Sequence, residues 1–251
     1  MSERSTPPLR VATYNVRACV GMDGYRSESR IAQVIAELSA DIVALQELDL
    51  SRRRSAGVDQ AGLIAEQLGW EKFFSPAMRV AEEQYGDAII SRLPMRLRQA
   101  QELPSVSSVL CRETRAAIWA EADTSEGTVQ VINTHLGLGR RERRMQMQLL
   151  VGSEWLGRVT PAEPLILMGD MNSFPGSKAY RILANELHDA RSFFTPPPAL
   201  RTYPTAFPIA AVDHIFLNNK VRVEKIWVAR SALARVASDH YPLVAEVRLQ
   251  A

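Results

Sequence analysis

The feature that most constrains the fold of this chain is a pattern found six times, in which a short apolar run ends in a polar residue able to handle a metal ion or a phosphate. A carboxylate at the end of a buried strand must be paired, hydrogen-bonded or metal-bound to stay charged. Six such segments in one chain therefore indicate one shared site. The segments are Thr13-Tyr14-Asn15, Leu45-Gln46-Glu47, Asn133-Thr134-His135, Gly169-Asp170-Met171-Asn172, Val212-Asp213-His214 and Ser238-Asp239-His240.

Length and composition favour a single soluble domain. The chain has 251 residues, of which 46% are hydrophobic, and this is enough for a substantial core. Its formal net charge of +2 indicates no strongly charged tail. Cys19 and Cys111 lie far apart and outside any CxxC motif, as is typical of a reduced compartment, and neither a signal peptide nor a membrane-spanning run is evident. We expect a cytoplasmic monomer with a flexible N-terminus at residues 1–8 and one domain at 9–251.

Strand and helix patterns alternate along the chain. Arg26–Ala40 is predicted to be helical because its apolar residues recur on one face, and Asp59–Gly69 has a capping Asp and a closing Gly. Further helices are predicted at Arg140–Gly157, with Met145, Leu149, Gly152 and Leu156 on its inner face, and at Ser177–Ala184, and the Pro-rich stretch Thr195–Pro208 is predicted to be an ordered loop. Strands are predicted at Leu9–Val16, Asp41–Leu45, Ala88–Ser91, Ala116–Ala122, Thr128–Asn133, Pro164–Met168, Ile215–Leu217, Val221–Val228 and Leu243–Leu249.

This alternation favours an α/β architecture in which helices cover the outer faces of packed sheets. The polar residues follow apolar strands, where α/β folds commonly place their chemistry. Glu47, Asp170 and Asn172 are the sharpest candidates. Each position has a structural alternative: Glu47 as a helix-capping or surface acid, Asn15 as a turn residue, Asp170 and Asn172 as an Asx-turn, and His135 as a hydrogen-bonded core histidine. Asp213 and Asp239 are suited to hold a histidine in one tautomer.

Taken in order, these segments resemble the endonuclease/exonuclease/phosphatase superfamily, which has the fold of deoxyribonuclease I. The likeness rests on the six segments together with Tyr85-Gly86-Asp87-Ala88-Ile89 and Arg115, and it spans almost the whole chain. The resemblance implies a four-layer α/β sandwich, in which two central mixed β-sheets lie face to face with helices outside. Asp87 departs from the Asn that many members have after this Gly.

The resemblance also implies the reaction, the hydrolysis of a phosphodiester with Mg²⁺ or Mn²⁺. Hard oxygen ligands suit these ions, and Glu47, Asn15 and Asp239 are the expected metal ligands. His240 is expected to act as general base or to orient water, with Asp213 holding its other nitrogen. Asp170 would align or activate the water, while Arg115, His135 and Asn172 would bind the phosphate and stabilise its charge; His135 is also a candidate to assist the leaving group.

The substrate is less constrained than the reaction. The His135 element is similar to the deoxyribonuclease, sphingomyelinase and inositol-phosphatase branches, and it argues against abasic-site repair. A nuclease is our first hypothesis, since Arg52–Arg54 and the arginines of Arg140–Arg144 could bind a polyanion. The alternative is that these arginines are ordinary surface charge, exposed to solvent and paired with nearby carboxylates. A lipid or inositol-phosphate phosphoesterase is the second, with Phe193, Phe194 and Pro196–Pro198 as a candidate apolar rim. A silent phosphate-binding scaffold is disfavoured because no expected catalytic residue is replaced.

Overall fold

The computed structural model describes residues 7–106 and 113–250 of the chain. Within them, two six-stranded sheets form the centre of the molecule. The first has the order β11 (Val221–Val228), β12 (Leu243–Leu249), β1 (Leu9–Asn15), β2 (Ile42–Leu50), β4 (Glu83–Ser91), β3 (Glu71–Val80). The second has the order β5 (Met95–Leu103), β6 (Arg115–Thr124), β7 (Gly127–His135), β8 (Leu165–Asp170), β10 (Asp213–Leu217), β9 (His188–Asp189). Each sheet is mixed, because β1 and β2 pair in parallel, as do β7 and β8.

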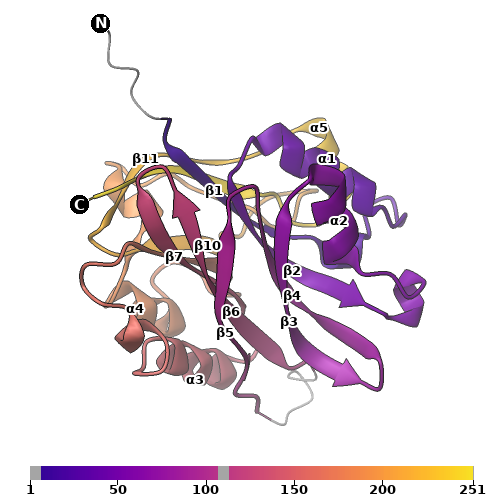
Figure 1. Cartoon of the computed structure of the whole chain (residues 1–251), viewed down its shortest axis with the longest axis horizontal. Coiled ribbons are helices and arrows are strands. Elements are labelled where there is room, and N and C mark those ends of the chain that lie inside the picture. Colours follow the sequence, from indigo (N-terminus) through magenta and orange to yellow (C-terminus); the bar gives the residue numbers. More distant parts are fainter. Residues whose placement is uncertain (1–6, 107–112, 251) are drawn as a thin grey trace, which may run out of the picture.

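Helices cover the outer face of each sheet (Figure 1). An apolar cluster joins the first sheet to α1 (Glu28–Leu38), α2 (Gln60–Leu68) and α5 (Ala232–Ala237). Another joins the second sheet to α3 (Arg140–Leu150) and α4 (Lys178–Ala184). A third cluster fills the space between the sheets. The predicted four-layer α/β sandwich is therefore confirmed.

Short 3₁₀ turns complete the connections at Arg17–Cys19, Arg53–Ser55, Leu156–Arg158 and Ala190–Phe193. Most predicted elements are present, and the bounds of β11 and β12 are those predicted. Asp59 caps α2 by accepting a hydrogen bond from the Gly62 N–H, and Gly69 ends the helix in the left-handed conformation. The stretch from Thr195 to Pro208 has no regular strand or helix, as expected.

The prediction for the longest helix was wrong at its C-terminal end. α3 ends at Leu150 rather than Gly157, and a short 3₁₀ turn follows. Its buried residues are Glu142, Gln146, Met147 and Leu150, so the predicted inner face was also wrong. The apolar period in the sequence continues through Gly152, past the point where the helix ends, while the buried face of the helix contains polar residues.

β3, β5, β9 and α5 were missed, and β9 has only two residues. β3 and β5 are edge strands. β5 is largely exposed and β3 contains Pro76, so neither shows a clean apolar alternation. α5 spans only Ala232–Ala237, which is too short for a helical period to stand out.

Parts of some predictions lie outside the described residues. These are Cys111 and most of the predicted flexible N-terminus, namely residues 1–6. Cys19 is buried with a free thiol. Across the described ranges, we find no helix that is both long enough and apolar enough to cross a bilayer. The single domain and the monomeric state stay predictions.

Candidate active site

Strand directions bring the six polar segments to one edge of the sandwich. β1, β2, β7 and β8 end at this edge with Asn15, Glu47, His135 and Asp170 on or near their last residues. β10 and β12 run antiparallel to their neighbours and therefore begin here. The register places Asp170 opposite both His135 on β7 and Asp213 on β10. Asp170 is thus the centre of the site in the second sheet.

A close approach of two strands explains the glycine before Asp170. A Cβ at Gly169 would lie 1.9 Å from the carbonyl oxygen of Thr134 on β7, so no other residue fits without moving the strand. After β8, Asn172 adopts φ 45°, a left-handed conformation that asparagine tolerates. Its backbone N–H donates to Asp170 Oδ1 at 2.9 Å. The Asx-turn alternative is therefore present, and the same turn holds both side chains at the site edge.

Glu47 reaches the site through an irregularity in β2. The pairing of β2 with β4 shifts register between Leu45 and Leu48, and Glu47 has φ 63°. Such a bulge re-aims a side chain, and a non-glycine residue there carries backbone strain. Asn15 Nδ2 donates to Glu47 Oε1 at 2.9 Å and to Asp170 Oδ2 at 3.1 Å. One amide thus draws two carboxylates from different sheets to the same point.

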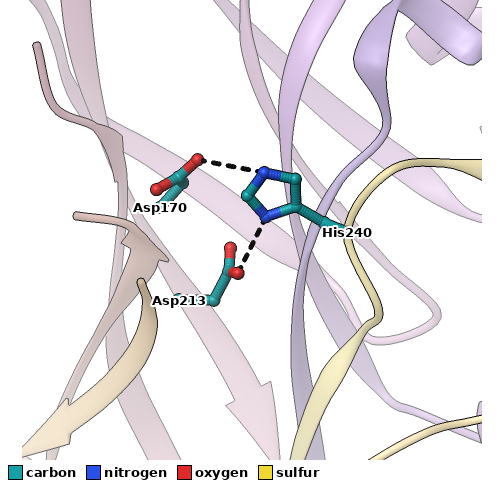
Figure 2. A group of neighbouring side chains, drawn as sticks. All are labelled: Asp170, Asp213 and His240. Carbon is teal, nitrogen blue, oxygen red and sulfur yellow. Dashed lines mark hydrogen bonds and ion pairs between the residues drawn. The ribbon is translucent and has the colours of Figure 1, made fainter. Parts of the chain in front are cut away.

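A buried chain of two carboxylates and one imidazole runs through His240 (Figure 2). His240 Nδ1 lies 2.9 Å from Asp213 Oδ2, and Nε2 faces Asp170 Oδ2 at 3.8 Å. The Thr202 hydroxyl also donates to Asp213 Oδ2, and the Tyr203 ring lies 4.7 Å from the imidazole. Burial alone would lower the pKa of His240, but Asp213, followed by Asp170 and Asp239, outweighs burial and raises this pKa to about 10.

The same surroundings raise the pKa of Asp170 above that of an acid at the protein surface. Its burial and the neighbouring charge of Asp213 raise the pKa of this carboxyl to about 6, against the opposing effects of His240 and of the hydrogen bonds from Asn172 and Asn15. At neutral pH the pair therefore consists of a protonated His240 and an ionised Asp170 that has a substantial affinity for a proton.

His135 is held neutral. Its Nδ1 accepts a hydrogen bond from Arg115 Nη1 at 3.0 Å, and its Nε2 lies 3.1 Å from Asn172 Nδ2 and 3.5 Å from Asp170 Oδ2. Arg115 can only donate, so the proton of the neutral ring is on Nε2. Burial, together with the charge of Arg115, holds the pKa of His135 well below its usual range. The positive charge at this position therefore belongs to Arg115, and His135 offers a hydrogen-bond donor.

The oxygen-rich side of the site fits a hard divalent cation. Glu47 supplies a carboxylate beside the amide of Asn15, and Asp170 Oδ2 meets the same amide. Asp239 has a carboxylate that is only partly exposed and lies 3.6 Å from Arg17 Nε. Asp170, Asp213 and His240 also bring one ligand atom each within 4.8 Å of one another. Because Asp213 and Asp170 face opposite nitrogens of one imidazole, we interpret this group as a proton-handling chain and the Glu47 side as the metal side.

Some residues of the six segments serve the scaffold instead. Gln46 Nε2 donates to Asn133 Oδ1 at 2.8 Å, and Asn133 Nδ2 donates to the carbonyls of Leu45 and Ala88, so these side chains link the two sheets. His214 is buried, and its Nε2 lies 2.8 Å from the carbonyl oxygen of Ser173. This contact stabilises the loop after Asp170.

Three further residues contribute to the site but were not predicted in that role. Thr202 and Tyr203 contact Asp213 and His240, and only their neighbourhood in Arg201–Pro204 hinted at it. Asp87 is buried beside the Glu47 backbone, where burial raises the pKa of its carboxyl to about 8 against the lowering effect of Arg115. A protonated carboxyl at this position offers a donor and an acceptor, as the amide of the Asn expected from the resemblance would.

Two cavities flank the site. One of about 300 Å³ is lined by Glu47, Arg17, Arg26, Arg54 and Tyr85 among others, and one of about 490 Å³ is lined by Asn172 together with basic residues of α3 and α4. Arg54 lies 2.7 Å from Asp49, and Arg52 lies 3.5 Å from the same carboxylate. Arg52 and Arg54 are therefore paired with a nearby carboxylate, as the alternative to polyanion binding expects.

The fold and this site define a class of α/β proteins that handle phosphate esters. The model of the endonuclease/exonuclease/phosphatase family matches residues 12–240, so the chain belongs to that family. The family consists of metal-dependent phosphoesterases, whose substrates include nucleic acids.

Individual relatives are distant. The chain is 26% identical over 233 residues to the uncharacterized protein YbhP of Escherichia coli K12, covering 87% of each chain. It is similar in fold to an endonuclease/exonuclease/phosphatase from Beutenbergia cavernae (TM-score 0.76, 22% identity, 98% of this chain and 72% of that one). It is also similar to a mannosyl-6-phosphatase from Bacteroides thetaiotaomicron (TM-score 0.73, 22% identity, 96% of this chain and all of that one).

Proposed function

We propose that the protein is a Mg²⁺- or Mn²⁺-dependent phosphodiester hydrolase and that its substrate is a nucleic acid. The observation that carries the hydrolase proposal is the convergence on Asp170 Oδ2 of Asn15 at 3.1 Å, His135 at 3.5 Å and His240 at 3.8 Å. These three side chains come from three different strand ends. A carboxylate with a pKa of about 6 at such a point is suited to take a proton from water near neutral pH.

In this mechanism Asp170 accepts the proton of the attacking water. The water oxygen bonds to phosphorus as the ester bond to the leaving oxygen breaks, and the leaving oxygen takes a proton from solvent to give an alcohol. His240, kept cationic by Asp213, faces the developing negative charge together with Arg115. The Asn172 amide and the His135 Nε2–H donate to phosphate oxygens. The predicted role of general base thus moves from His240 to Asp170, because an imidazole that is already protonated cannot accept a proton.

The metal would be held by the Glu47 carboxylate and by Asn15 Oδ1, which accepts a hydrogen bond from the Arg17 N–H at 3.1 Å, with Asp239 as a further carboxylate on the open side. A divalent cation there neutralises phosphate charge, which a hydrolase needs because phosphodiesters repel nucleophiles. Glu47 is suited to this role because its side chain is partly exposed beside a cavity. The hydrogen bond from Asn15 Nδ2 to Glu47 Oε1 holds the carboxylate in place.

A substrate panel tests this proposal. We expect Mg²⁺- or Mn²⁺-dependent hydrolysis of bis-p-nitrophenyl phosphate and of single-stranded RNA or plasmid DNA, lost on chelation. His240→Ala serves as the contamination control and should lose the activity. Hydrolysis of mannose 6-phosphate, but of no diester, would replace the diesterase proposal with a phosphatase.

A lipid-headgroup diesterase is the second candidate. Phe194 packs against the core and Phe193 lines a cavity with His188 and Arg222, away from the site residues, so the predicted rim gives this candidate no support. Phe207 and Ile209, 73% and 61% exposed, are a better basis, since their loop also carries Thr202 and Tyr203. Cleavage of sphingomyelin or phosphatidylcholine vesicles, with nucleic acids left intact, would favour this candidate.

A further inference from the structure

The cavity of about 490 Å³ beside Asn172 is not used by the mechanism above. Asn172 forms part of its wall and its Nδ2 lies 3.1 Å from His135 Nε2, so the cavity opens directly beside the expected position of the scissile phosphate. The other walls come from the start of α3 and from the segment between β8 and α4. The remaining lining residues are Arg140, Arg143, Arg144, Ser173, Phe174, Ser177, Lys178 and Ala179.

Three of the cationic side chains that line this cavity have no acidic partner among the described residues. Arg140, Arg144 and Lys178 are exposed, and no carboxylate of residues 7–106 or 113–250 forms an ion pair with any of them. The acid on the same helix does not compensate for them, because Glu142 is buried and its carboxylate packs against Gly137. This is the opposite of Arg52 and Arg54, whose charge is shared with Asp49. Among the described residues, Glu142 therefore forms no ion pair with Arg140 or Arg144, whose charge is exposed to solvent.

The wall of the cavity is held in place before any ligand arrives. Arg143 Nη1 donates to the carbonyls of Gly137 and Leu138, and Gln146 accepts from the Gly137 N–H at 2.9 Å. A Cβ at Gly137 would lie 2.0 Å from Glu142 Oε2, so the loop and the helix fit tightly. A preformed wall loses little entropy on binding.

An aromatic face completes the cavity. Phe174, two residues after Asn172, is 58% exposed and lines the same space as the three cations. Phosphate groups bind Arg and Lys, and unpaired bases stack on exposed aromatic rings. A phosphate and a ring are both present in a nucleotide, whereas a lipid headgroup or an inositol phosphate offers no aromatic face.

We propose that this cavity binds the nucleotide adjacent to the scissile phosphate of a single-stranded nucleic acid, with Arg140, Arg144 and Lys178 at its phosphate and Phe174 against its base. The inference rests on the proposed function and makes it more specific. It assigns substrate preference to residues outside the catalytic group, and it requires at least two phosphates in a good substrate.

Short thymidine oligonucleotides test the phosphate part. TpT has one phosphate, whereas pTpT and TpTp have two, one on either side. We expect the wild-type protein to prefer one of the two-phosphate substrates in kcat/KM, mainly through KM. Arg140→Gln/Arg144→Gln should reduce that preference by about tenfold, the usual discrimination of one lost charged contact. Arg141→Gln is the matched control, since Arg141 is an exposed neighbour that does not line the cavity.

The base part is tested with TpTpT and analogues in which one thymine is replaced by an abasic tetrahydrofuran. Phe174→Ala should reduce the preference for the intact trimer by about tenfold, the order expected of one base–aromatic stack. A preference ratio unchanged in the arginine variant, or lowered equally in Arg141→Gln, would overturn the inference while leaving the hydrolase intact. Absence of cleavage of every diester by the wild-type protein would instead contradict the proposed function itself.

Discussion

At the scale of single residues, the surroundings of Asp170, His135 and His240 decide whether each side chain carries a proton. Burial acts on all of them, but Asp213 outweighs it at His240, whereas at His135 it acts together with the charge of Arg115. Two histidines in one site are therefore held in opposite states, one cationic and one neutral. The sequence shows both as residues after apolar runs, and only the neighbours distinguish them.

These states predict a bell-shaped pH dependence of kcat/KM. Asp170 acts when ionised, so the rate should rise as pH rises through about 6; His240 acts when protonated, so the rate should fall as pH passes about 10. Asp213→Asn removes the main charge that raises the pKa of His240 and should move the upper limb to lower pH. An upper limb at the same pH in this variant would contradict the assignment to His240.

Stability should also depend on Asp170. Its pKa is raised from 3.8 to about 6 by folding, so its favourable contribution is present below pH 3.8 and is lost as pH rises through about 6. The unfolding free energy of Asp170→Asn minus that of the wild type should therefore increase by about 1–3 kcal/mol as pH rises from about 4 to about 7.5. Urea unfolding of both proteins at each pH measures this change, and a difference that is independent of pH would show that the carboxyl is not strained by its burial.

At the scale of elements, the strand ends could be predicted more readily than their irregularities. Continuous apolar runs located β8 and the start of β2, because a strand buried on both faces consists largely of apolar residues. The turn of Glu47 out of β2 was not predictable, since the bulge depends on β4, a neighbour distant in sequence. The same holds for Thr202, whose contact with Asp213 depends on the course of a loop.

The contact between β7 and β8 predicts a large effect of a small change. Gly169→Ala places a methyl group against the Thr134 carbonyl and should lower the unfolding free energy by about 1–3 kcal/mol, because the parallel pair must separate. Gly57→Ala is the control, with a positive φ of 73° but no atom within 4 Å of the added Cβ. Equal destabilisation of the two variants in urea would assign the effect to backbone conformation alone.

The bulge in β2 predicts a specific metal effect. Glu47→Gln keeps the size of the side chain and removes its charge, so the Mg²⁺ concentration needed for half-maximal activity should rise at least about tenfold while the melting temperature changes little. A titration of activity with Mg²⁺, alongside thermal unfolding, separates the two. Unchanged Mg²⁺ activation would remove Glu47 from the metal site.

At the scale of the whole molecule, the two sheets are joined directly beneath the site. Asn133 on β7 bonds to Gln46 and to two carbonyls of the opposite sheet, and Asn15 on β1 bonds to Asp170 on β8. The site is therefore built across the interface of the two sheets. The order of the motifs was enough to predict this sandwich, whereas the side-chain links that hold its layers in register required the structure.

The central claim is that these strand ends form one metal-dependent phosphodiester hydrolase site around Asp170 and His240. Its most direct test is the steady-state hydrolysis of bis-p-nitrophenyl phosphate at saturating Mg²⁺ by the wild-type protein and by His240→Ala. The account predicts a loss of about 10²–10³-fold in kcat for the variant, the size expected when one group that stabilises developing negative charge is removed, with its fold unchanged by circular dichroism. Turnover of His240→Ala within a few-fold of the wild type would contradict it.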